Sequence, residues 1–100
     1  MFIVHQTEQF IEWLDGLRDV KAQVRIAARI RHIEAGSLGD WKPIAGGVSE
    51  LRVDYGPGYR IYFTRRGREL IILLAGGDKS GQKRDIRRAL QIASRLGELE

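Results

Sequence analysis

The sequence predicts an α+β fold with an N-terminal strand, a helix hairpin, a three-stranded antiparallel meander and a C-terminal helix, in the order β-α-α-β-β-β-α. Three observations lead to this prediction. Apolar residues recur at helical spacing between residues 7 and 36, alternate with polar residues between 49 and 65, and form an unbroken run at 70–75. The chain has 100 residues, and we expect residues 1–100 to form one domain.

The N-terminal third indicates one strand and two helices. The strand is expected at residues 1–5, and Thr7 is a suitable N-cap for a first helix that Gly16 ends. A second helix is expected from Asp19 to Gly36, packed against the first as an antiparallel hairpin. Its wide buried face would combine two neighbouring stripes, which are Val20, Val24 and Ala27, and Ile26, Ile30 and Ile33.

The middle of the chain indicates a loop and then three strands. Residues 37–47 contain three glycines and a proline and are expected to form a loop. The alternating runs 49–55 and 59–65 flank a Gly-Pro-Gly turn and predict a hairpin. Residues 70–75 are apolar throughout, which predicts a central strand covered on both faces. The Gly-Gly pair that follows indicates either a strand-to-helix turn or a place where the backbone approaches a ligand closely.

A final helix is expected from about Ser80 to Leu96. Ile86, Ala89, Leu90 and Ala93 would face the core, while Lys83, Arg84, Arg87 and Arg88 would lie on or near the other side. Cations at the start of a helix oppose its dipole, which mildly favours a functional role for them. A solvated face that keeps the protein soluble is the alternative.

Charge is distributed unevenly along the sequence. The net charge is +4, yet residues 52–88 hold ten Lys or Arg against four Asp or Glu. Such a concentration suits a polyanion or an acidic partner, or it forms a solvated surface. Absence of cysteine excludes disulfides and fits a reducing, cytoplasmic compartment. No apolar run approaches the length of a membrane span, so no membrane association is expected.

Several polar residues of the two alternating strands share one phase. Arg52, Arg60 and Tyr62 would point away from Leu51 and Ile61, with Lys79 just past the central strand and Lys83 at the start of the last helix. Guanidinium groups bind phosphate oxygens, and aromatic rings stack on unpaired bases. A phosphodiester backbone is therefore one candidate ligand. The alternative is that Arg52 and Arg60 are cross-strand neighbours of the carboxylates Glu50 and Asp54.

Three blocks of sequence resemble a known family. They are TEQFxxWL at 7–14, ELRVDYGPGYRIYF at 50–63 and LLAGGDKSGQKRDIRRA at 73–89. The chain is similar from about Thr7 to Ala93 to the addiction-module killer proteins, the phage-derived Gp49-like or HigB-like group of the RelE/ParE toxin superfamily. This resemblance implies a RelE-like fold and a toxin of a type II toxin–antitoxin pair, whose partner is a helix-turn-helix antitoxin.

Toxins of the RelE and HigB branches cleave messenger RNA, usually on the ribosome, with the 2′-hydroxyl of the substrate as nucleophile and with no metal or cofactor. By this resemblance Arg60, Arg52 and Lys79 are the expected catalytic residues. Tyr62, Gln82, Lys83 and Arg84 are the expected substrate-binding residues. The charged groups hold the RNA backbone and stabilise the transition state only if they converge at one place and are not each paired with an internal acid.

The sequence departs from this pattern in the residues that would transfer protons. RelE-type toxins often place a tyrosine near the start of the last helix, and some HigB proteins place a histidine there, whereas this chain has QKRDI. Asp85 or Asp78 could act as a weak base, or Asp85 could complement the helix dipole. Two other functions stay open, because ParE-like relatives act on DNA gyrase and an inactive relative would act only within an antitoxin complex.

Overall fold

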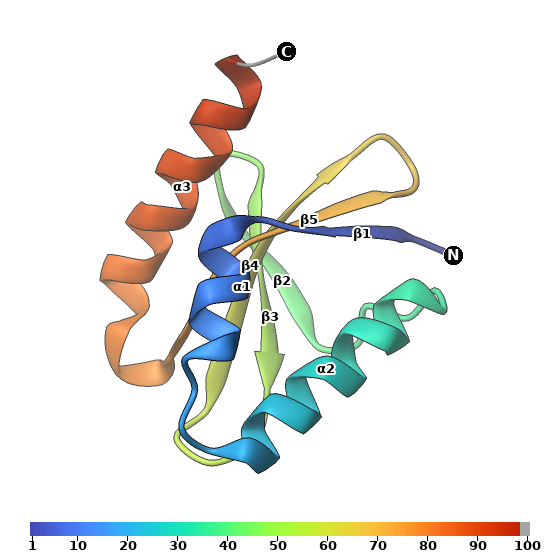
Figure 1. The fold of residues 1–100 in the computed structure, drawn as a ribbon. Helices are drawn as coiled ribbons and strands as arrows, with labels where there is room; N and C mark the ends of the chain where they lie inside the picture. The colour runs from blue at the N-terminus through green and yellow to red at the C-terminus, as the bar shows by residue number, and fades with distance from the viewer. Residues whose placement is uncertain (99–100) are drawn as a thin grey trace.

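A five-stranded sheet with the order β1-β5-β4-β3-β2 organises the fold (Figure 1). The computed structural model describes residues 1–98. Its strands are β1 (Ile3–Gln6), β2 (Trp41–Ala45), β3 (Val48–Val53), β4 (Tyr59–Arg66) and β5 (Leu70–Asp78). Its helices are α1 (Glu8–Asp15), α2 (Val20–Glu34) and α3 (Gln82–Glu98), with a 3₁₀ turn, η1 (Lys79–Gly81), before α3. β1 pairs with β5 in parallel, and the other neighbours are antiparallel. The predicted α+β class is confirmed.

The first two helices begin at the residues that the sequence indicates. The Thr7 hydroxyl accepts a hydrogen bond from the backbone N–H of Phe10, and α1 ends before Gly16. At α2, the Asp19 carboxylate accepts from the N–H groups of Lys21 and Ala22. These caps satisfy donors that a helix leaves unpaired at its first turn.

The predicted burial of α2 is wrong for one of its two stripes. Val20 and Val24 are 67% and 59% exposed, while Ile26, Ile30 and Ile33 are buried. The reason is that α1 lies on β5 and α2 lies on β1 and β3, so each helix packs on the sheet and the two diverge from their connection (Figure 1). A helix on a sheet buries one stripe, and the second stripe would have needed a closely packed helical partner.

The segment 37–47 is not wholly a loop, because it contains β2, which adds a strand to the predicted order. β2 pairs antiparallel with β3, with an irregularity between Pro43 and Ala45. Pro43 is tolerated because β2 is an edge strand. Gly46 and Gly47, with φ of +54° and +78°, form the two-residue turn into β3. The sequence Gly46-Gly47 was thus the signal of a hairpin between β2 and β3.

β5 extends three residues beyond the predicted strand, so Gly76 and Gly77 lie in the sheet and not in a turn. They pair with Ile61 and Arg60 of β4. A Cβ on Gly76 would overlap the ring of Trp13 in α1, and a Cβ on Gly77 would overlap the carboxylate of Asp85 in α3. The two glycines therefore let helices approach the same strand closely on its two faces.

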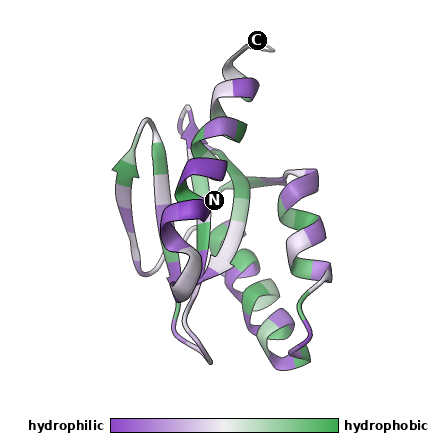
Figure 2. Cartoon of the chain, turned by 90° about the vertical axis from the view of Figure 1, so that its left-hand side faces the viewer, coloured by the Kyte–Doolittle hydropathy of each residue, from purple (hydrophilic) through white to green (hydrophobic). Residues whose placement is uncertain are grey.

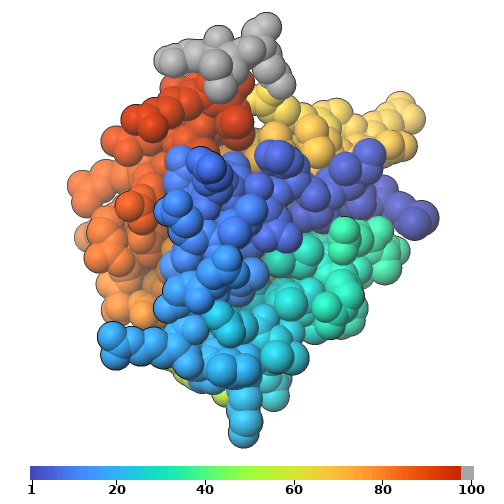
Figure 3. Space-filling view, viewed as in Figure 1, coloured from blue at the N-terminus to red at the C-terminus, as the bar shows by residue number. Residues whose placement is uncertain are grey.

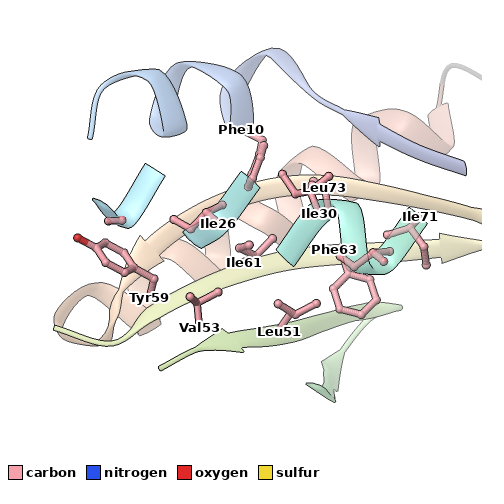
Figure 4. Close-up of a cluster of buried hydrophobic side chains, with 12 residues drawn as sticks. Phe10, Ile26, Ile30, Leu51, Val53, Tyr59, Ile61, Phe63, Ile71 and Leu73 are labelled. Atoms are coloured by element: carbon pink, nitrogen blue, oxygen red, sulfur yellow. The ribbon is translucent and has the colours of Figure 1, made fainter. Parts of the chain in front are cut away.

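Two apolar clusters lie on opposite faces of the sheet. The first joins the sheet to α1 and α2 and includes Phe10, Ile26, Ile61 and Leu73 (Figure 4). The second lies beneath α3 and has as its buried members Val48, Tyr62, Ile72, Leu74, Ala75, Ala89 and Ile92. β5 contributes to both clusters, which confirms the prediction of a central strand covered on both faces. Over residues 1–98, none of the helices has the length and apolar character needed to cross a membrane.

Candidate functional site: a buried carboxylate among cations

A buried carboxylate, Glu50 of β3, lies among positively charged side chains on the α3 face of the sheet. Glu50 is only 1% exposed. Its Oε1 is 3.2 Å from Nε of Arg60, and its Oε2 is 3.5 Å from Nζ of Lys42 and 3.7 Å from Nη2 of Arg52. We call Lys42, Glu50, Arg52, Arg60 and Gln82 the Glu50 cluster.

Strand register brings these residues together. Lys42 of β2 is directly opposite Glu50, Arg52 is opposite Arg60, and Glu50 is opposite Tyr62. Residues that differ by two along a strand share a face, so all these side chains point to the α3 side. The predicted common phase of Arg52, Arg60 and Tyr62 is confirmed.

The start of α3 closes one side of the cluster. Gln82, the first residue of α3, donates from Nε2 to Oε1 of Glu50 over 3.3 Å. Arg60 also donates from Nη1 to the backbone oxygen of Tyr59 over 3.2 Å. Glu50 and Arg60 are therefore held from several directions, although the buried Nε of Arg60 makes no hydrogen bond among the described residues.

Exposure rises from the centre of the cluster to its rim. The Arg60 side chain is 12% exposed, Arg52 39% and Lys42 54%. Three cations share a single carboxylate, so the cluster keeps a positive balance. Arg52 and Arg60 do converge, but both contact the internal acid Glu50, so these two arginines do not meet the condition that the cations be free of internal acids. Lys42 and Arg52 remain accessible to an anion at the rim.

Lys79 lies beside the cluster without joining its ion pairs. A Cβ on Gly58 would lie 3.6 Å from Nη1 of Arg60 and 3.7 Å from Cβ of Lys79, so both side chains flank this glycine. The backbone N–H of Lys79 also donates to the Gly58 oxygen. Lys79 itself is exposed, and with Gln82, Lys83 and Arg84 it lines a shallow depression of about 450 Å³ at the start of α3.

Tyr62 lies at the site but not as a surface for base stacking. The residue is wholly buried beneath α3, so its ring has no free face for an unpaired base. Burial, followed by the charges of Glu50 and Asp85, raises the pKa of Tyr62 to about 12. Its hydroxyl stays protonated near neutral pH and has no hydrogen-bond partner among the described residues.

The two aspartates that the sequence singled out have different surroundings. Asp78 caps η1, where hydrogen bonds from the hydroxyl and the backbone N–H of Ser80 lower the pKa of its carboxyl. Asp85 is buried in the first turn of α3, and its Oδ1 lies 3.3 Å from Nε of Arg84. Its other oxygen, Oδ2, has no hydrogen-bond partner within residues 1–98.

Sequence reasoning missed Lys42 and the burial of Glu50. Lys42 was placed in a loop, whereas it lies on β2 opposite Glu50. Glu50 has the phase of Arg52, which was a usable signal, although its burial depends on α3 crossing the sheet. In the part of the chain that the structure describes, no group of three or more His, Asp or Glu side chains is placed to hold a metal ion.

The α+β fold presents a cluster of cations around a buried carboxylate on one face of its sheet. Residues 12–96 match the model of the family described as phage derived protein Gp49-like (DUF891). A protein of Haemophilus influenzae, described as uncharacterized, is 43% identical over 94 residues, which cover 94% of this chain and 95% of that protein. The chain therefore belongs to the Gp49-like family, which is a family of toxin–antitoxin toxins.

Proposed function

We propose that this protein cleaves messenger RNA on the ribosome as the toxin of a type II toxin–antitoxin pair. It acts in the cytoplasm, and a helix-turn-helix antitoxin neutralises it. Its place in the RelE/ParE superfamily is part of the same proposal. The observation that carries the proposal is the positive balance of the Glu50 cluster, with three cations from three strands around one carboxylate. Such a group can bind a phosphodiester and stabilise charge that develops on its oxygens.

The proposed reaction is an internal transfer within the RNA. The 2′-oxygen attacks the adjacent phosphorus, and the bond from phosphorus to the 5′-oxygen breaks. The products are a 2′,3′-cyclic phosphate and a 5′-hydroxyl. Because the nucleophile belongs to the substrate, the protein has to position the phosphate, stabilise its charge and accept one proton.

Each residue near the phosphate has a role in this proposal. Arg60 and Arg52 stabilise the phosphoryl oxygens, and Lys42 adds a third cation at the rim. The contacts of Lys42 and Arg52 with Oε2 of Glu50 are long, at 3.5 and 3.7 Å, so a phosphate can replace them. Oε2 then accepts the proton of the 2′-hydroxyl, and water supplies the proton of the 5′-hydroxyl product. Lys79, Lys83 and Arg84 bind flanking phosphates.

The test is expression of variants without antitoxin, combined with mapping of 5′-hydroxyl ends in cellular RNA. Arg60→Ala and Glu50→Gln should each lower the cleavage rate on the order of 10²-fold, because one stabilises the transition state and the other accepts the proton. Arg52→Ala is a second variant at a more exposed position. Arg31→Ala, an exposed cation on α2, is the matched control and should cleave as the parent protein does. Thermal unfolding of each purified variant separates loss of activity from loss of folding.

Three results would contradict the proposal. One is undiminished cleavage by the folded Arg60→Ala and Arg52→Ala variants, which would overturn the roles given to these two arginines. The second is growth arrest with intact messages and stalled DNA replication, which would indicate a ParE-like action on gyrase. The third is normal growth with the unaltered protein at high expression, which would indicate an inactive relative that acts only within an antitoxin complex.

A further inference from the structure

A second feature, separate from the Glu50 cluster, is a groove between α1 and α3. It has a volume of about 810 Å³, and its walls come from both helices and from the end of β5. In Figure 3 the surfaces of α1 and α3 lie side by side, and the groove runs along this junction. Trp13 lines one wall, and Arg84, Arg87 and Arg88 line the other.

The floor of the groove is an open strand edge. β1 pairs with only the first part of β5, from Leu70 to Leu73. Thr7 then turns the chain away into α1, with its N–H and hydroxyl bonded to the backbone oxygen of Leu73 and its hydroxyl also to that of Leu74. Past this point, no strand within residues 1–98 pairs with the outer edge of β5.

The unpaired stretch of this edge lies at the bottom of the groove, where Ala75, Gly76 and Gly77 are buried between α1 and α3 and Asp78 is partly exposed. Gly76 and Gly77 lie there and line the groove together with Asp78. An unpaired strand edge presents N–H and C=O groups in alternation, which match another polypeptide backbone. Nucleic acid has no such repeating pattern of donors and acceptors along its backbone. The edge therefore favours an extended peptide.

The charge of the groove selects the kind of peptide. Asp85 is paired with Arg84, and Asp78 accepts hydrogen bonds from Ser80. Arg87 and Arg88 have no ion pair with any carboxylate that the structure describes, so the α3 wall keeps uncompensated positive charge. The hydrophilic outer side of α3 is visible in Figure 2, which views the molecule from this side. Acidic side chains on the added strand would meet these arginines.

We propose that an extended, acidic segment of a partner polypeptide binds in this groove as an added strand along the outer edge of β5. Backbone hydrogen bonds to residues 75–78 provide affinity, and ion pairs with Arg87 and Arg88 select acidic side chains. Trp13 packs against the apolar side chains that alternate with the acidic ones. The inference concerns a partner and does not depend on RNA cleavage.

The test uses the full protein and a short synthetic peptide in which glutamate alternates with valine. At saturation, hydrogen exchange of the outward-facing amides within residues 75–78 should slow about tenfold or more, because a strand now covers them. Arg88→Glu should weaken binding about tenfold. Arg18→Glu, the same charge change at an exposed position in the link between α1 and α2, should leave affinity within about twofold.

Two control peptides complete the design. Lysine in place of glutamate should abolish binding, and methylation of the backbone nitrogens that face β5 should weaken it strongly. The proposal is wrong if the glutamate peptide does not bind, if it binds without slowing exchange at residues 75–78, or if the lysine peptide binds equally well. RNA cleavage is not measured in this experiment, so its result is independent of the proposed activity.

Discussion

Tyr62 has a hydroxyl that is buried without a hydrogen-bond partner among the described residues. Leaving such a group unpaired costs stability, because it loses its bonds to water on folding. Tyr62→Phe should therefore raise the free energy of unfolding near neutral pH by about 1 kcal/mol, measured by urea denaturation. A loss of stability would contradict this and would mean that the hydroxyl makes a bond in solution that the structure does not contain.

The raised pKa of Tyr62 also predicts that the free energy of unfolding changes at alkaline pH. The pKa of Tyr62 is raised from 10.0 to about 12 in the folded protein, chiefly by burial. Between these values the unfolded chain releases the proton and the folded protein retains it, so stability falls as pH rises. This titration costs the parent protein no stability below pH 10, and the loss grows as pH rises through about 12. Tyr62→Phe has no hydroxyl to ionise, so the parent protein should lose more stability than the variant across this range.

Urea denaturation of the two proteins at several pH values checks that prediction. Tyr55 and Tyr59 also have pKa values raised by burial, and they are common to both proteins. The difference between parent and variant therefore isolates Tyr62. Equal slopes of the free energy of unfolding against pH would show that Tyr62 titrates alike in the folded and unfolded states.

At the scale of elements, the sequence predicts what depends on near neighbours. Thr7 and Asp19 mark helix starts because a cap acts within three residues, and alternation in β3 and β4 places Arg52 and Arg60 on one face. The sequence is a poorer guide to features that depend on contacts between residues far apart in the chain. The exposure of Val24 follows from how α2 lies on the sheet, and the burial of Glu50 follows from the path of α3.

The contact between β5 and α3 can be tested through Gly77. A methyl group at this position would overlap the buried Asp85 carboxylate, so the strand or the start of α3 would have to shift. Gly77→Ala should therefore lower the free energy of unfolding by about 1–3 kcal/mol, as overpacking does in protein interiors. Urea denaturation provides the measurement.

Gly97 gives a control position, because it lies in α3 and not at the contact between β5 and α3. It has nothing near the position of an added methyl group. Gly97→Ala should raise the free energy of unfolding only slightly, by about 0.5 kcal/mol or less, since alanine is the better helix former but Gly97 lies next to the last residue of α3. If Gly77→Ala were as stable as the parent protein, α3 would not approach β5 as closely as the structure indicates.

For the whole molecule, folding distributes the positive charge of residues 52–88 over several surfaces, two of which carry the proposed binding sites. Arg52 and Arg60 lie in the Glu50 cluster, while Arg87 and Arg88 line the groove between α1 and α3. The sequence showed the excess of charge but not where each cation lies, because that depends on how β3 and β4 pair and on how α3 lies across the sheet. An RNA and an acidic peptide could therefore bind different surfaces of the same small protein.

The salt dependence of RNA binding tests whether RNA contacts the Glu50 cluster or only the overall positive charge of the protein. A single-stranded RNA bound by three cations should lose affinity with a slope of about −2 in log K against log salt, since each neutralised phosphate contributes about −0.7. Lys42→Ala removes the most exposed cation of the Glu50 cluster and should make the slope shallower by about 0.7. Arg31→Ala, on the opposite side of the sheet, should leave it unchanged. Equal changes with both variants would mean that RNA contacts the protein through its overall charge, and the Glu50 cluster would then have no special part in binding it.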